Sequence, residues 1–425
     1  MSVPSTLSAL SPTTWPFSLD LLPQPVHLVG GAVRDALLER RADYLDLDFI
    51  IPTDAVATAS SIAKRYQAGF VILDAERQIA RVVFEGATAD FAQQEGNSLE
   101  ADLRRRDYTI NAIAYDPRDR AWIDPLNGMK DVRKRLIRMV SKANLQDDPL
   151  RLLRAYRQAA QLDFSIHSRT RAALRQLAPQ LQTVAAERVR VELGYLLGCA
   201  EGGKWLKEAW EDGLFDFWLE GTQQENFEQI KQVEQCAWLL GRIWQELDRL
   251  LDEKLTLQAL SWESLAKLAC LVSSDPAIAQ AQLEKLKYSR SEIRAVTVAI
   301  KHLPRLLRSR DVPLNLREQY HLFQEVDRAF PMLGLLTVAV AAQKGILQET
   351  TAVGTIAPLI NRYLDPHDLV AHPQPLISGT ELMAALQLSP SPAIGKLLLE
   401  IQIAAIEGRI STPKEALDFA ATLLN

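Results

Sequence analysis

Asp46 and Asp48 are the first residues of this sequence whose spacing suggests chemistry, because they flank Leu47 at the start of the apolar run Phe49–Ile51. Side chains two residues apart on a strand share a face. Two carboxylates so close repel each other unless a divalent cation lies between them. We interpret the pair as ligands of two Mg²⁺ ions, replaceable by Mn²⁺, that activate an attacking hydroxyl and stabilise a leaving pyrophosphate. An exposed acidic turn is the alternative, which the apolar neighbours disfavour.

A glycine pair offers a second feature. The strand predicted over Val26–Val29 runs into Gly30-Gly31, and a helical pattern follows over Ala32–Leu38. Bare backbone N–H groups at a helix start suit a phosphate. The pair matches neither the dinucleotide fingerprint nor the P-loop. Taken alone, it also fits an ordinary tight turn.

Three consecutive arginines, Arg104–Arg106, can grip a triphosphate or an RNA backbone bidentately. Asp107 and Asn111 follow them and could either bond a ribose hydroxyl or orient the arginines. Asp90, in the predicted strand Ala87–Phe91, could be a third catalytic carboxylate or an ordinary surface charge. A solvated surface is the alternative interpretation of the arginine run.

A fourth group opens a predicted helix at Asp148-Pro149. Aspartate before proline is typical of a helix N-cap. Capping does not explain the arginines that follow at three-residue spacing, which share a face with Asp148. A carboxylate beside a guanidinium can bond the Watson–Crick edge of a base, and further arginines would reach phosphates. The arginines concerned are Arg151, Arg154 and Arg157.

Two kinds of element must position these residues. The first ~120 residues alternate β-rich runs with helical stretches, whereas the chain from Pro149 onward is helical in period, with breaks at Pro, Ser and Asp. Strands are expected at Val26–Val29, Leu47–Ile51, Phe70–Leu73, Arg81–Phe84, Ala87–Phe91 and Ile110–Tyr115, and a helix at Thr53–Tyr66. The predicted fold is an α/β head followed by a long all-helical region. The expected divisions are an N-terminal extension (1–22), the head (23–143), a helical neck (144–200), and a body and tail (201–425).

Composition narrows the class of protein. The 425 residues are 48% hydrophobic and 24% charged, as in globular proteins of more than one domain. No apolar run is long enough to span a bilayer. Three widely spaced cysteines fit buried positions in a reducing cytoplasm. The net charge of −5 hides a segment, Glu100–Ala200, with 19 Lys and Arg against 12 Asp and Glu, which fits a phosphate-binding surface or a solvated helix face.

The order of these motifs resembles the class II tRNA nucleotidyltransferase and bacterial poly(A) polymerase family. The matching blocks are Leu28–Asp35, Asp46–Asp48, Asp102–Ala112, Ile123–Gly128 with Asp131, Asp148–Arg157 and Glu187–Leu193, with weaker matches at Ile377–Gly379 and Pro392–Gly395. The resemblance is strong over residues 26–195 and looser beyond.

The resemblance implies a head with a DNA-polymerase-beta-like fold and an enzyme that extends tRNA 3′ ends from CTP and ATP. By position it implies Asp46 and Asp48 as metal ligands. It places Gly31, Arg34 and Arg105 at the incoming nucleotide and makes Asp148 and Arg151 the readers of the base, supported by Arg154 and Arg157. The neck, body and tail would hold the tRNA acceptor arm.

Two departures from the family pattern stand out. Asp147 replaces the usual glutamate, and Ala92–Asn97 stands where CCA-adding members carry a longer, often basic loop. The short segment resembles CC-adding members, whose terminal A comes from a separate A-adding enzyme. A poly(A) polymerase is the alternative within the family, disfavoured by the lack of a basic tail. An inactive RNA-binding homologue and a small-molecule nucleotidyltransferase are the others, disfavoured respectively by the carboxylate pair and by the helical region.

Overall fold

The computed structural model describes residues 9–40, 44–254, 256, 259–309, 311–343 and 349–424. The first eight residues of the expected N-terminal extension therefore lie outside the described residues. The chain divides into two compact units. The first comprises Met1–Ala185 with Glu208–Leu214, and the second comprises Ala186–Lys207 with Phe215–Asn425.

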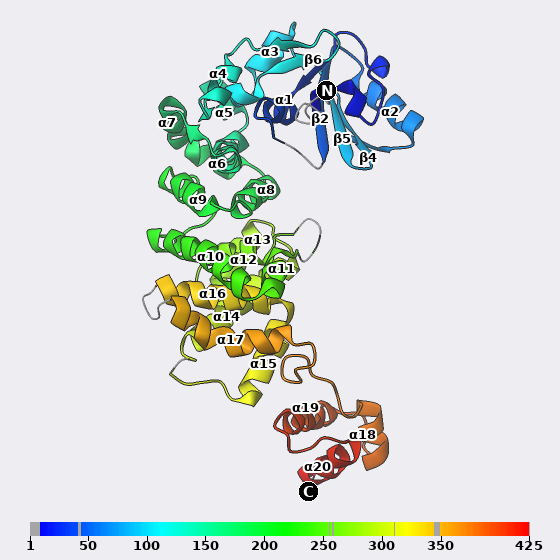
Figure 1. The fold of residues 1–425 in the computed structure, drawn as a ribbon, viewed down its shortest axis with the longest axis vertical. Coiled ribbons are helices and arrows are strands. Elements are labelled where there is room, and N and C mark those ends of the chain that lie inside the picture. The colour runs from blue at the N-terminus through cyan, green and yellow to red at the C-terminus, as the bar shows by residue number, and fades with distance from the viewer. Residues whose placement is uncertain are drawn as a thin grey trace. The chain divides into compact units, whose positions relative to one another are not determined.

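A mixed seven-stranded sheet, in the order β3-β4-β5-β2-β1-β6-β7, forms the centre of the first unit (Figure 1). The central strands β2 and β5 are parallel, and the other neighbours are antiparallel. The strands are β1 (His27–Val29), β2 (Leu45–Ile51), β3 (Gly69–Asp74), β4 (Ile79–Phe84), β5 (Ala87–Gln93), β6 (Ala114–Asp116) and β7 (Ala121–Ile123). A separate two-stranded sheet pairs β8 (Leu136–Ile137) with β9 (Ser165–Ile166).

Five of the six expected strands are confirmed, and the sixth is half wrong. Thr109–Asn111 forms a 3-10 turn, and β6 begins only at Ala114. The side chains of this turn explain the difference, because Thr109 Oγ1 donates to Asp131 Oδ2 at 2.8 Å and Asn111 Nδ2 donates to Asp107 Oδ1 at 3.0 Å. Such side-chain bonds compete with the regular ladder of a strand.

Helices of the first unit carry the remaining predicted motifs. They are α1 (Gly30–Leu37), α2 (Ala55–Tyr66), α3 (Leu99–Arg104), α4 (Gly128–Arg133), α5 (Lys142–Asp147), α6 (Leu150–Leu162) and α7 (Ser168–Leu177). The expected helix after Asp148 is α6, which begins one residue later than predicted, with Pro149 at the N-cap. At the start of α2, Asp54 is the N-cap but its side chain makes no capping hydrogen bond.

The side chains of strand β2 alternate between the buried core and the opposite face of the sheet. Its odd-numbered residues Leu47, Phe49 and Ile51 are fully buried. Phe49 stacks on Phe91 with ring centroids 5.4 Å apart, and Trp15 contacts Phe49 edge-on at 4.9 Å. Since successive side chains of a strand point to opposite faces, Asp46 and Asp48 lie on the other face of the sheet.

The second unit is helical. Its helices are α8 (Ala186–Leu197), α9 (Gly202–Glu211, shared with the first unit), α10 (Gln224–Ile243), α11 (Gln245–Asp252), α12 (Trp262–Leu271), α13 (Pro276–Lys285), α14 (Arg290–Leu307), α15 (Leu316–Val326), α16 (Phe330–Gln343), α17 (Glu349–Leu364), α18 (Gly379–Leu386), α19 (Pro392–Ile406) and α20 (Pro413–Leu424). The break expected over Pro304–Pro313 is confirmed, because α14 ends at Leu307 and α15 begins at Leu316, although α14 continues through Pro304. No described helix is both long enough and apolar enough to span a bilayer.

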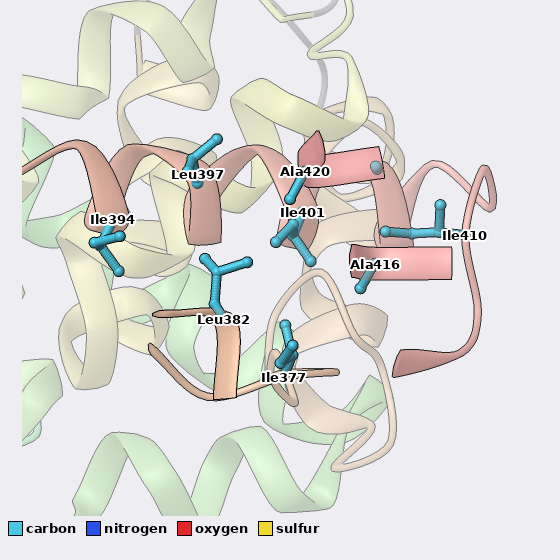
Figure 2. Close-up of a cluster of buried hydrophobic side chains, with 9 residues drawn as sticks. Ile377, Leu382, Ile394, Leu397, Ile401, Ile410, Ala416 and Ala420 are labelled. Atoms are coloured by element: carbon cyan, nitrogen blue, oxygen red, sulfur yellow. The ribbon is translucent and has the colours of Figure 1, made fainter. Parts of the chain in front are cut away.

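The last three helices share a small core of their own. Leu382 of α18, Ile401 of α19 and Ala416 of α20 are buried against one another (Figure 2). Ile394 and Leu397 extend the contact along α19. The weaker family matches at 377–379 and 392–395 therefore lie at the starts of α18 and α19, in one compact cluster.

Candidate active site

Ten of the eleven residues predicted to bind metal or nucleotide line one cavity of the first unit, with a volume of about 490 Å³. They come from α1, β2, the arginine segment after α3, and α6. The ten are Gly31, Arg34, Asp46, Asp48, Arg105, Asp107, Asn111, Arg151, Arg154 and Arg157. The exception is Asp148.

The aspartate pair lies at the sheet side of this cavity. In the parallel pairing of β2 with β5, Asp46 is opposite Thr88 and Asp48 is opposite Asp90. The hydroxyl of Thr88 donates to Asp46 Oδ1 at 2.7 Å. Burial, followed by the charges of Asp46 and Asp90, raises the pKa of Asp48 to about 7. The negative charge gathered here is thus only partly compensated by the protein.

This arrangement fits a divalent cation. Among the residues that the structure describes, no cluster of three or more His, Cys, Asp and Glu is arranged to hold a metal ion. Two carboxylates nevertheless match the way Mg²⁺ is commonly bound, with few protein ligands and the remainder supplied by water and substrate phosphates. A cation beside Asp48 would favour its ionised form, which burial and neighbouring carboxylates oppose.

Gly30 allows the start of α1 to pack closely against Asp48. Its φ is +73°, and a Cβ added there would lie 2.5 Å from Asp48 Oδ2. Gly31 is less constrained, since its added Cβ would meet only Arg34 Nη2, at 3.7 Å. Sequence reasoning selected Gly31 and missed Gly30, because nothing in a Gly-Gly pair indicates which residue faces the carboxylate.

Replacing Gly30 with alanine should lower kcat/KM for nucleotide incorporation by roughly 10–100-fold, because moving Asp48 by about 1 Å disrupts catalytic geometry. The positive φ adds a conformational cost of about 1–2 kcal/mol. Steady-state kinetics would measure the loss of activity, and thermal unfolding would measure the cost in stability.

Gly86→Ala is the matched control for Gly30→Ala. Gly86 has a φ of +75°, and its added Cβ would meet nothing within 4 Å. It therefore carries the same conformational cost without the clash. Equal activity of the two variants would refute the close approach of Gly30 to Asp48 as the reason for glycine.

Two hydrogen bonds and an ion pair connect the arginines of α1 and α6. Arg34 Nη1 donates to Asn111 Oδ1 at 2.9 Å, and Asn111 Nδ2 donates to Asp107 Oδ1 at 3.0 Å. Asp107 Oδ2 pairs with Arg154 Nη2 at 3.2 Å. Burial works against it, but the charge of Arg154 and the bonds from Asn111 and from the Tyr108 N–H hold the pKa of Asp107 below its usual value. In this structure the side chains of Asp107 and Asn111 thus hold Arg34 and Arg154, and their predicted roles toward a ribose hydroxyl and the arginine run stay predictions.

The adjacent arginines of the run have different surroundings. Arg105 Nη2 pairs with Glu95 Oε1 at 2.8 Å. Arg106 is more buried and also lines the cavity, and its charge lowers the pKa of Asp48. Sequence reasoning did not separate Arg106 from its neighbours, because three consecutive arginines carry no signal for which one turns inward.

The residues expected to read the base are held by the backbone. Arg151 Nη1 donates to the carbonyl oxygens of Arg105 at 2.7 Å and Asn144 at 3.2 Å. Asp148 Oδ1 accepts from the N–H of Leu150 at 3.3 Å, a capping contact at the start of α6. The base-reading role of Asp148 and Arg151 therefore stays a prediction.

Asp90 is engaged by an arginine of the neighbouring strand. Arg81 donates to both of its carboxylate oxygens, from Nε at 2.7 Å and from Nη2 at 2.8 Å. Asp90 is therefore neither an isolated surface charge nor an uncompensated third carboxylate. The sequence left both interpretations open, because the register of β4 on β5 that brings Arg81 to Asp90 is a tertiary feature.

The sequence also matches known proteins along most of its length. Residues 26–138 match the poly A polymerase head domain, and residues 163–225 match the probable RNA and SrmB-binding site of polymerase A. A CC-adding tRNA nucleotidyltransferase of Synechocystis sp. is 47% identical over 410 residues, which cover 96% of each chain. This chain belongs to the class II tRNA nucleotidyltransferase and poly(A) polymerase family. The expected family and its nucleotidyltransferase activity are thereby confirmed.

Other relatives and solved structures agree with this membership. An A-adding tRNA nucleotidyltransferase of Deinococcus radiodurans is 32% identical, with 93% of this chain and 95% of that protein covered. The structure of a CCA-adding enzyme with ATP aligns with a TM-score of 0.71 at 22% identity, covering 94% of this chain and 92% of that one. A Thermotoga maritima CCA-adding enzyme complexed with tRNA aligns with a TM-score of 0.66 at 21% identity, covering 94% and 92%. The predicted architecture, an α/β head followed by helices, is confirmed.

Proposed function

We propose that this chain is a CC-adding tRNA nucleotidyltransferase, which adds C residues from CTP to the 3′ end of tRNA without a nucleic-acid template. The observation that carries the reaction type is the Asp46–Asp48 pair at the wall of an arginine-lined cavity. The relative from Synechocystis, which is named for CC addition and matches over nearly the whole chain, supports the product.

In the proposed reaction the tRNA 3′-hydroxyl oxygen forms a bond to the α-phosphorus of CTP. The bond from that phosphorus to the bridging oxygen breaks in line, pyrophosphate leaves with the electron pair, and the hydroxyl proton is lost to solvent. Two Mg²⁺ ions, or Mn²⁺, held by Asp46 and Asp48 would lower the hydroxyl pKa and neutralise developing charge. The position of both carboxylates on one face of the sheet supports this proposal.

Nucleotide binding is assigned to the other residues of the cavity. The start of α1 with Gly31 and Arg34 suits the phosphates, because backbone N–H groups and a guanidinium converge there. Arg105 adds a further cation. Asp148 and Arg151 are proposed to read the base, with Arg154 and Arg157 as support.

The short connector between β5 and α3, residues 94–98, carries the choice of CC over CCA. It contains no Lys or Arg, and its residue Glu95 is bonded to α3 and to the arginine run. A segment held in this way has little freedom to remodel the site from C to A. Under this proposal a separate A-adding enzyme completes the tRNA end, and ATP is a poor substrate.

The tRNA acceptor arm is proposed to bind the neck (144–200) and the body and tail (201–425). The basic segment Glu100–Ala200 supplies charge for its phosphates. The proposed location is the cytoplasm, where the three cysteines would remain thiols. Cys236 and Cys270 are buried as expected, whereas Cys199 is partly exposed, so that expectation was wrong for one of the three.

A primer-extension assay tests the product. The protein is incubated with three tRNA transcripts, ending before the first C, after CC and after CCA, each with CTP, with ATP or with both. We expect the first transcript to grow by two residues with CTP and the second to stay unchanged with ATP. Addition of CCA would show that a short connector still permits switching, and long A tracts would identify a poly(A) polymerase. No extension of any transcript would indicate an inactive homologue.

A further inference from the structure

Glu95 joins the connector after β5 both to α3 and to the arginine run. Its backbone N–H donates to Asp102 Oδ2 at 2.9 Å, and its carboxylate Oε1 pairs with Arg105 Nη2 at 2.8 Å. The Asp102 side chain is 2% exposed, so it is a fixed anchor. The backbone of Glu95 is therefore held in place, and its carboxylate is presented to one arginine.

Arg105 depends on this contact for its orientation. Its guanidinium lines the cavity, and the Glu95 carboxylate is closer to Nη2 than that of Asp102, which lies 3.6 Å away. The Nε–H is buried and has no hydrogen-bond partner. A long, 38% exposed side chain held mainly at one end has several other rotamers available, and restricting them costs conformational entropy.

We propose that Glu95 is a positioning residue for the incoming nucleotide, which it serves by holding the Arg105 guanidinium ready for the phosphates. The inference rests on the proposed role of Arg105 as a nucleotide contact. Glu95 itself does not line the cavity, so it acts through the arginine.

The charge of Glu95 also has an opposing effect on nucleotide binding. The negative charge of Glu95 repels a triphosphate, so its removal could also tighten binding. This repulsion acts over a longer distance than the 2.8 Å contact and through a group that is 36% exposed, where water and salt screen it. The direct ion-pair contact therefore dominates, and its loss weakens nucleotide binding.

The test is the Glu95→Ala variant. An exposed ion pair is worth ~0.2–1 kcal/mol, so KM for CTP should rise roughly 1.5- to 5-fold while kcat stays within about twofold. Glu95→Gln keeps the size of the side chain but removes the charge of the ion pair, and should raise KM about as much as Glu95→Ala. In a double-mutant cycle, Glu95→Ala should add nothing to Arg105→Ala.

Glu100→Ala is the matched control. Glu100 pairs with Arg104 at 2.6 Å in the same segment, but both side chains are more than half exposed and neither lines the cavity. This variant should keep the wild-type KM. Thermal unfolding of all variants checks that they remain folded.

Direct titration with CTP, without tRNA, separates this inference from the proposed function. If the wild type binds CTP but does not add CC to tRNA, the proposed function fails and the titration still reports on Glu95. An affinity of Glu95→Ala equal to that of Glu100→Ala would overturn the inference. Tighter CTP binding in both Glu95→Ala and Glu95→Gln would also overturn it, because repulsion would then outweigh positioning.

Discussion

Asp48→Asn should reduce nucleotide incorporation at least about a thousandfold, or ~4 kcal/mol of barrier, because it removes one of the two carboxylates proposed to hold the catalytic cations. The fold should survive. Burial and the charges of Asp46 and Asp90 raise the pKa of Asp48 to about 7, so the ionised side chain opposes folding above that pH. A neutral isostere should therefore leave the melting temperature at pH 8 unchanged or raise it. Single-turnover kinetics and calorimetry provide the two measurements.

Asp163→Asn is the control for this charge removal. Asp163 lies in the same unit at the end of α6, in the left-handed conformation that asparagine tolerates, and its side chain is 90% exposed. Its activity should equal that of the wild type. Near-normal turnover in Asp48→Asn would remove the basis for the metal assignment.

Asp107→Asn should have the second largest effect, on stability and nucleotide affinity together. It removes the charge that pairs with Arg154, which costs about 2–3 kcal/mol, somewhat less than for a fully buried pair because Arg154 is 36% exposed. CTP affinity should fall about tenfold, because Arg154 loses the carboxylate that holds it at the cavity. Urea denaturation and CTP titration measure the two effects.

The stabilisation contributed by the Asp107 carboxylate should depend on pH. The pKa of Asp107 is lower in the folded chain than its usual value, so its contribution to stability is fully present at neutral pH. It is lost as the pH falls below about 4 toward the folded pKa. The difference in unfolding free energy between wild type and Asp107→Asn should therefore shrink in acid. A difference that stays constant down to pH 2 would contradict the ionic origin.

Asp131→Asn is the control that separates a loss of folding stability from a loss of CTP affinity. Asp131 is as buried as Asp107 and pairs with Arg138 at 2.8 Å, but it does not line the cavity. It should lose comparable stability with little change in CTP affinity. Equal losses of affinity in both variants would mean that Asp107 acts only through the fold.

What the sequence could predict followed from periodicity and spacing. The alternation around Asp46 and Asp48 predicted both the strand and the shared face of the carboxylates. The helix with Arg151, Arg154 and Arg157 was predictable because its arginines recur at helical spacing. These features are local, so a few neighbouring residues determine them.

The missed features depend on contacts between distant segments. The need for glycine at position 30 follows only from the approach of Asp48 on the next strand. The role of Arg106 follows only from its position near Asp48. Ile110 and Asn111 were predicted as the start of a strand, but buried bonds from Thr109 to Asp131 and from Asn111 to Asp107 hold this segment in a turn. No local pattern encodes such partners.

Because core side chains and carboxylates alternate along β2, folding and the proposed activity depend on the same seven residues, Leu45–Ile51. Leu47, Phe49 and Ile51 are buried in the core, while Asp46 and Asp48, at the alternate positions, carry the two carboxylates. A slip of one residue against β5 would put aspartates into the core and leucine into the cavity. The slipped register would therefore be destabilised by the same error that displaces the carboxylates, because their charge would be buried in the apolar core. Quality control by stability alone would be enough to remove molecules with a misaligned site.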